Sequence, residues 1–314
     1  MYRIGIDLGG TNIVAGVVDD NYRIIGSSRC KTRLPRPAKE IIGDMANIAL
    51  EAAANAKISF DDISYVGVGC PGTCNNDSGI VEYSNNLDFV NVPIREILYD
   101  AIKKPIYIEN DANAAALGET LAGAAKGAQS CVCITLGTGV GSGIIIDGKI
   151  YSGFNFSGGE LGHTVIMLNG EPCTCGRNGC WESYASATAL IRQTKAAMQA
   201  DKNSIMWTIA KTLDNVDGRT SFDAMRQGDE SGRQVVDNYI NYLACGLINV
   251  INIFQPEVLC IGGGICKEGD TLIKPLEKLI EKERYSRYCA CQTRLCVAEL
   301  GNDAGIIGAA CIGQ

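Results

Sequence analysis

Four residues with the chemistry of metal ligands lie close together in the sequence. His163, the only histidine of the chain, is followed by Cys173, Cys175 and Cys180. Three thiolates and one imidazole form a tetrahedral zinc site, and the glycines and turn residues between the cysteines close a compact loop that a metal would rigidify. The alternative is a group of buried free thiols in a chain with 15 cysteines. The spacing favours zinc.

Two acidic residues flank this cluster and could bind a polyhydroxylated ligand. Glu160 lies three residues before His163, so both side chains can reach one ligand if the segment is helical or tightly turned. A zinc ion on one ring nitrogen of His163 would leave the other nitrogen to donate to a sugar oxygen. Glu182, two residues after Cys180, would be positioned likewise. In this interpretation the metal supports the reaction and does not perform it.

Two glycine-rich turns could bind phosphate. Leu8-Gly9-Gly10-Thr11 and Leu136-Gly137-Thr138-Gly139 each follow an apolar run, and their glycines expose backbone N–H groups that suit phosphate oxygens. Thr11 and Thr138 add hydroxyl groups. Asp7, at the end of the first predicted strand, could hold Mg²⁺ through its waters. One triphosphate with its metal would explain all three features, whereas glycines that only permit sharp hairpins are the alternative.

Two competing phosphate motifs do not fit their surroundings. Gly137–Gly139 would need a helix directly after it to be a dinucleotide fingerprint, but Ile144–Ile146 continues as a strand. The stretch Gly143–Lys149 has nearly the Walker A spacing, but Ile150 follows where a Ser or Thr should bind Mg²⁺. Gly262–Gly264 follows a predicted strand and could let an adenine ring or ribose approach the backbone closely.

Asp111 is the candidate catalytic base. A strand predicted over 105–108 leads into Glu109-Asn110-Asp111, and a helix predicted over 112–122 begins at once. Phosphoryl transfer needs a carboxylate that takes the proton of the acceptor hydroxyl, and a strand end fixes a side chain in place. Asn110 offers an amide to a neighbouring hydroxyl. The alternative role for Asp111 is a helix N-cap.

The two glycine turns belong to two similar stretches of chain. Ile6 and Ile134 precede the turns, Asp19 and Asp147 mark the hairpins after them, and both pairs are 128 residues apart. This offset predicts two lobes that each open with strand, glycine turn, strand, turn and strand, although glycine-rich hairpins can also resemble each other by chance. Other predicted elements are a strand over 22–29, helices over 38–57, 183–200, 234–253 and 271–285, and strands over 65–69 and 258–261.

Length and charge limit the possible functions. A chain of 314 residues exceeds the size at which one core usually stops growing, which favours two lobes. A net charge of −7 argues against binding to nucleic acid or to an anionic membrane surface. The N-terminal residues run directly into a strand without a signal-like segment, and no run of about 18 apolar residues follows. Abundant cysteine without such a signal indicates a reducing compartment, so we expect a cytoplasmic protein.

The zinc-ligand segment carries a family resemblance. Cys173-Thr174-Cys175-Gly176-Arg177-Asn178-Gly179-Cys180-Trp181-Glu182, preceded by Glu160-Leu161-Gly162-His163, resembles the zinc signature of the ROK family of bacterial sugar kinases and repressors. The similarity spans essentially the whole chain and is closest to the family's glucokinases. It implies an α/β fold of the two-lobed, actin-like ATPase type, hexokinase-like, with a ribonuclease H-like duplication and an interlobe cleft. We expect residues 1–115 plus 299–314 to form a small domain and 116–298 a large domain with the zinc-binding loop.

The same resemblance implies ATP-dependent phosphorylation of the 6-hydroxyl of glucose, with Mg²⁺, structural Zn²⁺ and Asp111 as the base. The implied nucleotide-binding residues are Gly9, Gly10, Thr11, Asn12, Thr138, Gly139, Gly262 and Gly263. The implied sugar-binding residues are Gly72, Asn86, Asn110, Asp111, Glu160, His163 and Glu182. Where the family often has Trp near Asn86, this chain has Phe89, and Asn85 is an alternative contact. A homodimer or homotetramer is implied as well.

Two alternative functions stay open at this point. The same carboxylate and zinc framework serves several hexoses in the family, so N-acetylmannosamine, N-acetylglucosamine, fructose or allose could be the substrate. A non-catalytic sugar-responsive regulator is the second alternative, because some relatives are repressors with an added N-terminal helix-turn-helix. Here the first predicted strand begins at Ile4 and the net charge is wrong for DNA. We therefore expect ATP and a hexose as partners, and neither nucleic acid nor membrane.

Overall fold

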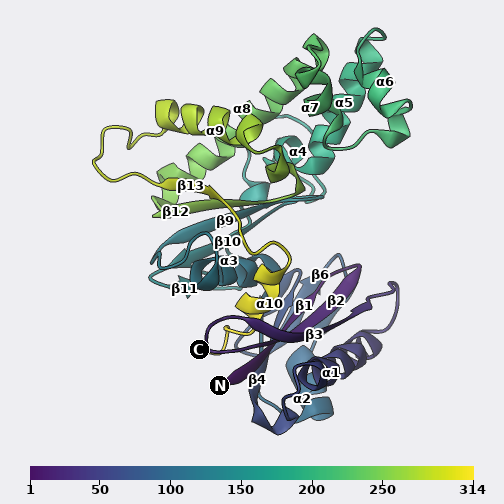
Figure 1. The fold of residues 1–314 in the computed structure, drawn as a ribbon, viewed down its shortest axis with the longest axis vertical. Helices are drawn as coiled ribbons and strands as arrows, with labels where there is room; N and C mark the ends of the chain where they lie inside the picture. Colours follow the sequence, from purple (N-terminus) through teal and green to yellow (C-terminus); the bar gives the residue numbers. More distant parts are fainter. The chain divides into compact units, whose positions relative to one another are not determined.

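The computed structural model describes all residues from Met1 to Gln314 and shows an α/β protein (Figure 1). The chain forms two compact units. Unit 1 comprises Met1–Cys133, Gly143–Gly159 and Ala298–Gln314, and unit 2 comprises Ile134–Ser142 and Glu160–Val297. The predicted domain boundaries stay a prediction, and the units differ from them in placing residues 116–133, 143–159 and 298 in unit 1.

A five-stranded mixed sheet forms the centre of unit 1. Its strand order is β3-β2-β1-β4-β8, where β1 is antiparallel to β2 and parallel to β4. These strands are apolar enough to be buried, and helices α1 and α2 supply further core side chains. The bounds are β1 Tyr2–Leu8, β2 Asn12–Val18, β3 Ile24–Lys31, α1 Ala38–Asn55, η1 Phe60–Asp62, β4 Ile63–Cys70, α2 Ile94–Ile102 and β8 Ile106–Asn110. A small sheet of β5 Thr73–Asn75, β6 Ile80–Ser84 and β7 Phe89–Val92 accompanies it.

A second five-stranded sheet repeats this arrangement with the order β11-β10-β9-β12-β13. As in the first sheet, the two outer strands on one side form a hairpin, β10 with β11, and β12 runs parallel to β13. The bounds are β9 Cys131–Leu136, β10 Val140–Ile146, β11 Lys149–Ile150, β12 Val258–Gly263 and β13 Arg294–Val297. The duplication predicted from the 128-residue offset is therefore confirmed by the strand order.

Helices make up most of the remainder of unit 2. They are η2 Leu161–His163, α4 Glu182–Ala185, α5 Ala187–Ala200, α6 Met206–Ala210, η3 Leu213–Asn215, α7 Thr220–Arg226, α8 Glu230–Phe254, η4 Gly264–Glu268 and α9 Asp270–Glu283. The helix predicted over 183–200 is divided at Ser186, because the Ser186 hydroxyl accepts a hydrogen bond from the N–H of Ala189 and so caps α5. No helix combines the length and the apolarity that crossing a membrane requires.

Two helices of unit 1 pack unusually closely. These are α3 (Asp111–Ala122), which follows β8, and α10 (Asp303–Ala309), near the C-terminus. A Cβ on Gly308 would lie 1.6 Å from the carbonyl oxygen of Ala114, and a Cβ on Gly118 would lie 2.3 Å from that of Ala304. Glycine at both positions therefore lets the backbones touch, and this contact fixes the helix that begins at Asp111.

This contact makes a prediction about stability. Gly308→Ala should destabilise the protein by about 2 kcal/mol or more, because a methyl group has no space against the backbone of α3. Gly43→Ala is the matched control, since no atom lies within 4 Å of a Cβ at that position in α1, and it should stabilise the protein by about 0.5–1 kcal/mol through helix propensity. Urea unfolding of the two variants measures both effects, and equal stabilities would contradict the proposed packing.

Candidate functional site

The junction of β8 and α3 leaves Asp111 free of a capping role. Asn110 is the N-cap of α3, and its Oδ1 accepts hydrogen bonds from the N–H groups of Ala112 at 2.9 Å and Asn113 at 3.2 Å. Asp111 occupies the first helical position, and only its Oδ1 is engaged, at 2.9 Å from the N–H of Ala112. The alternative that Asp111 is the helix cap is thus wrong, and its second carboxylate oxygen has no protein partner.

Asp7 is the second carboxylate of unit 1 that has an unusual environment. It pairs with Val14 of β2 and Gly69 of β4, and a Cβ on Gly305 of α10 would come within 3.2 Å of its Oδ2. Burial, and after it the charge of Asp111, raise the pKa of Asp7 to about 6. Burial also raises the pKa of Asp111. Two carboxylates that repel each other in a partly desolvated environment can bind a divalent cation, and either of them can accept a proton during a reaction.

The first glycine turn presents two open N–H groups. The N–H of Gly9 bonds back to the carbonyl of Asn12 at 2.9 Å, and the Thr32 hydroxyl donates to the carbonyl of Gly9 at 2.6 Å. The next two N–H groups, those of Gly10 and Thr11, have no partner in the protein. The turn is therefore rigid, and the open donors are Gly10 and Thr11 rather than Gly9.

Unit 1 also brings predicted sugar-binding residues to the β8–α3 junction and to the first glycine turn. Asn110 donates through Nδ2 to the carbonyl of Gly72 at 3.1 Å. A Cβ on Gly10 would lie 3.6 Å from the backbone oxygen of Asn86, whereas the Asn85 amide oxygen accepts a hydrogen bond from Tyr83. Of the two neighbouring asparagines, Asn86 is thus the one that lies against the glycine turn.

The second glycine turn, in unit 2, is built like the first. The N–H of Gly137 bonds back to the carbonyl of Gly139 at 3.0 Å, and the N–H groups of Thr138 and Gly139 have no partner in the protein. The next N–H, that of Val140, donates to Glu182 Oε2 at 2.9 Å. A Cβ on Gly139 would lie 2.3 Å from the same oxygen, so glycine is needed there for Glu182 to reach the turn.

The cysteine and histidine cluster has the dimensions of a metal site. The ligand atoms of His163, Cys173, Cys175 and Cys180 all lie within 4.8 Å of one another. Cys173 Sγ is 3.5 Å from His163 Nδ1, and Cys175 Sγ is 3.6 Å from Cys180 Sγ. A tetrahedral zinc site with bond lengths of about 2.3 Å to sulfur and 2.0 Å to nitrogen requires separations of roughly 3.5–3.8 Å. The four residues therefore fit a metal ion, and Nδ1 of His163 is the nitrogen that faces the thiols.

Two acidic residues adjoin this cluster within unit 2. Glu182 Oε1 lies 3.8 Å from Cys173 Sγ, so one carboxylate touches both the cluster and the glycine turn. The carbonyl of Glu160 accepts the N–H of His163 at 3.1 Å in the 3₁₀ turn η2. This confirms the tight turn that the sequence required for Glu160 and His163 to serve one ligand.

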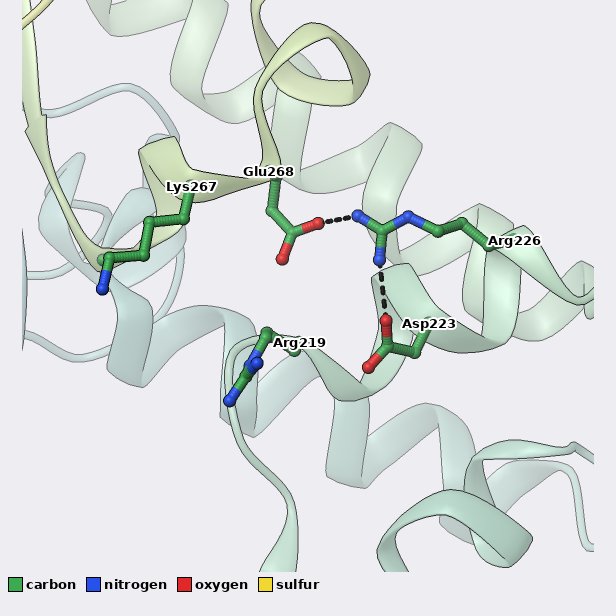
Figure 2. Close-up of a pocket in the computed structure, with 6 residues that line it drawn as sticks. Arg219, Asp223, Arg226, Lys267 and Glu268 are labelled. Atoms are coloured by element: carbon green, nitrogen blue, oxygen red, sulfur yellow. Dashed lines mark hydrogen bonds and ion pairs between the residues drawn. The ribbon is translucent and has the colours of Figure 1, made fainter.

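A pocket adjoins the predicted nucleoside turn in unit 2. Gly263 has a positive φ of 114°, and a Cβ there would lie 2.1 Å from the carbonyl of Leu136, which places this turn beside the second phosphate turn. The pocket next to it, of about 480 Å³, is shown in Figure 2. It is lined by Arg219, Asp223, Arg226, Gly264, Lys267 and Glu268.

Only some of the charged side chains around this pocket form ion pairs. Arg226 bridges Asp223, at 2.7 Å, and the buried Glu268 (Figure 2). Arg219 and Lys267 have no side-chain partner and remain available to a ligand. Sequence reasoning named Gly262 and Gly263 but missed the charged residues, because nothing predicted α7, and charged side chains near a glycine turn carry no signal of their own.

Comparison with known proteins places the chain in a family. The ROK family model matches residues 3–314. The glucokinase of Thermotoga maritima is 37% identical over 98% of this chain and 96% of its own length. The glucokinase of Halalkalibacterium halodurans is 35% identical over 98% and 93%. The crystal structure of a ROK family glucokinase from Streptomyces griseus in complex with glucose and AMPPNP has a TM-score of 0.82 at 32% identity and 99% coverage of both chains. The expected actin-like sugar-kinase fold is thereby confirmed, and the chain belongs to the ROK family.

Proposed function

We propose that this protein is an ATP-dependent glucokinase, which transfers the terminal phosphoryl group of ATP to the 6-hydroxyl of glucose. The observation that carries the proposal is the β8–α3 junction, where Asn110 caps the helix and leaves the Asp111 carboxylate open. Glucokinase relatives that match over nearly their whole length support the same conclusion. Other hexoses stay alternatives that an assay must decide.

Asp111 acts as the base in this mechanism. Its carboxylate accepts the proton of the sugar hydroxyl as that oxygen attacks the γ-phosphorus, and the bond to the β-phosphate oxygen breaks. Burial raises the pKa of Asp111 and so makes it a stronger base than an exposed aspartate. Asp7 would hold Mg²⁺ through water, and that ion, when bound, neutralises charge on the phosphates.

The nucleotide is bound by backbone donors and by the pocket of unit 2. The open N–H groups of Gly10 and Thr11, and those of Thr138 and Gly139, would bind phosphate oxygens. Gly9 and Asn12 shape the first of these turns by their mutual hydrogen bond. Gly262 and Gly263 let the nucleoside approach the backbone, with the pocket of Figure 2 beside it.

The residues that we propose for hexose binding are Gly72, Asn86, Asn110 and Asp111 in unit 1, and Glu160, His163 and Glu182 in unit 2. A structural Zn²⁺ would bind His163 through Nδ1, because that nitrogen lies 3.5 Å from Cys173 Sγ. Nε2 would then be protonated and could donate to a sugar oxygen. We further propose a homodimer or homotetramer that works in the cytoplasm, where its nucleotide substrate is abundant.

The first prediction of this proposal concerns substrate and base. In an assay that measures ADP release over a panel of glucose, N-acetylmannosamine, N-acetylglucosamine, fructose and allose, glucose should give the highest kcat/KM. Asp111→Asn keeps the shape of the side chain but cannot accept the proton, so kcat should fall by about 10²-fold or more while KM changes little.

Circular dichroism of Asp111→Asn checks that the variant is folded. If the folded variant phosphorylates its hexose at the parental rate, Asp111 is not the base. If the parental protein phosphorylates no hexose of the panel, the proposed function is wrong.

The second prediction concerns the metal. Purified protein should contain about one equivalent of zinc per chain, since four suitable ligands are present. Cys175→Ser should lose the zinc and raise KM for glucose by about tenfold or more, because His163 and Glu182 lose their support. Cys245→Ser is the control, since Cys245 is also exposed but lies on α8, outside the cluster. Parental protein that contains no zinc and is still folded and fully active would exclude the zinc.

The third prediction concerns the charge of Asp7. Its pKa in the folded protein is about 6 against an ordinary value of 3.8, so Asp7 binds a proton more tightly in the folded state than in the unfolded state. The resulting contribution to the free energy of unfolding is complete below pH 4 and is lost as the pH rises through 6. Without metal or nucleotide, the parental free energy of unfolding should therefore fall relative to Asp7→Asn between pH 4 and 8. At about 1.4 kcal/mol per pKa unit the fall is roughly 3 kcal/mol.

Asp77→Asn serves as the control for this measurement, because Asp77 is exposed in the same unit. Urea unfolding at several pH values measures the difference. A difference between parent and Asp7→Asn that does not change with pH would show that Asp7 is not destabilised by its surroundings. Asp7→Asn should also lose most activity, since its carboxylate would hold the metal.

A further inference from the structure

Glu109, two residues before the proposed base, is a buried carboxylate that accepts four hydrogen bonds. It is only 2% exposed. Its Oε1 accepts from the N–H of Asn110 at 2.9 Å and from Asn113 Nδ2 at 3.0 Å. Its Oε2 accepts from Asn76 Nδ2 and from the Ser152 hydroxyl, both at 3.0 Å. No lysine or arginine pairs with it, so these four neutral donors alone compensate its burial.

The two oxygens of Glu109 serve different parts of unit 1. Oε1 holds the end of β8 and the first turn of α3, which are the residues on either side of Asp111. Oε2 holds the turn after β5 and the segment that begins at Ser152. The carbonyl of Ser152 in turn accepts the N–H of Gly158 at 2.8 Å, and this segment continues directly into Glu160.

A buried charge at position 109 lowers the stability of the fold unless other groups compensate its desolvation. Ile106 and Ile108 of the same strand are buried and apolar, and an apolar residue at 109 would avoid the desolvation of a carboxylate. What an apolar residue could not do is accept hydrogen bonds from both sides of Asp111, through Asn110 and Asn113, and at the same time from Asn76 and Ser152 in two other segments. The arrangement therefore favours a role in geometry over a role in stability.

We infer that Glu109 is a positioning residue of the kinase reaction, which sets the orientation of Asp111 through Oε1 and the path of the 152–159 segment toward Glu160 through Oε2. The inference rests on the proposed function. Glu109 touches neither substrate nor phosphate in this role. Its effect on the reaction passes through Asn110 and Asn113 on one side and through Ser152 on the other.

The two halves of the role can be separated by substitution. In Glu109→Gln the amide oxygen must face the N–H of Asn110, because a backbone donor cannot turn away. The amide NH₂ then faces Asn76 and Ser152, where donor meets donor until the Ser152 hydroxyl rotates. Glu109→Gln and Ser152→Ala therefore both weaken the Oε2 half, whereas Glu109→Ala removes both halves.

Glu119 provides a matched control at the other end of α3. It is also 2% exposed, and it accepts hydrogen bonds from the backbone N–H groups of Ala124 at 2.9 Å, Leu300 at 2.9 Å and Glu299 at 3.2 Å. Glu119→Gln thus removes the charge of an equally buried carboxylate from the same unit without touching the neighbours of Asp111. A purely structural carboxylate at 109 would behave like Glu119.

The test measures kcat, KM for the hexose and the unfolding midpoint for the parental protein and these four variants. Glu109→Gln and Ser152→Ala should raise KM for the hexose about fivefold to tenfold and leave kcat within about threefold. Glu109→Ala should lower kcat by about 10²-fold, since a displacement near 1 Å has that effect. Glu119→Gln should keep parental kinetics and change only the unfolding midpoint.

Parental kcat and KM in Glu109→Gln, together with a drop in unfolding midpoint equal to that of Glu119→Gln, would overturn the inference. If Glu109→Ala does not fold, Glu109→Gln and Ser152→Ala still decide it. The parental protein in the same assay separates the two claims. An active parent with kinetically silent Glu109 variants refutes only the positioning role, whereas an inactive parent refutes the proposed function and the role that rests on it.

Discussion

A helix needs a cap at its N-terminus, and a base needs an oxygen that nothing else uses. At the start of α3 these needs fall on adjacent residues and are met separately. Asn110 satisfies the N–H groups of Ala112 and Asn113, so Asp111 keeps one oxygen without a partner. The close contact of α3 with α10 then fixes where that oxygen points, because Gly308 lets the two backbones touch. The orientation of the proposed base thus depends on a cap and on two glycines that do no chemistry.

The duplicated sheet applies one device twice. In each copy a strand ends in a glycine turn whose first N–H is used inside the turn, and the next two N–H groups are left without partners. A turn that stabilises itself with one hydrogen bond can hold its other donors fixed before any ligand arrives. In unit 2 the same turn is tied further, through Val140 and Glu182, to the cysteine cluster. Metal binding and phosphate binding would therefore stiffen the same carboxylate.

The sequence indicates the parts of this molecule that depend on local patterns. The offset of 128 residues predicted the duplication, and the strand-end position of Asp111 and the spacing of His163, Cys173, Cys175 and Cys180 predicted candidate sites. Local patterns could not show which residue caps α3, because Asn and Asp are equally good caps. The turn around Gly9 was similarly ambiguous, since the sequence does not reveal which N–H groups a turn uses internally.

Non-local contacts set the remaining limit. The pocket of Figure 2 is lined from α7 and η4, which are separated by the whole of α8, so no spacing rule relates Arg226 to Glu268. Glu109 is a stronger case. In the sequence it is one acidic residue two positions before another, and its chemistry becomes visible only when Asn76 and Ser152 are found at its carboxylate. A glutamate at the end of an apolar strand is nevertheless a signal, because a buried charge persists only where other groups satisfy it. A glutamate at a strand end near a predicted catalytic aspartate therefore indicates that hydrogen-bond donors from other segments surround it.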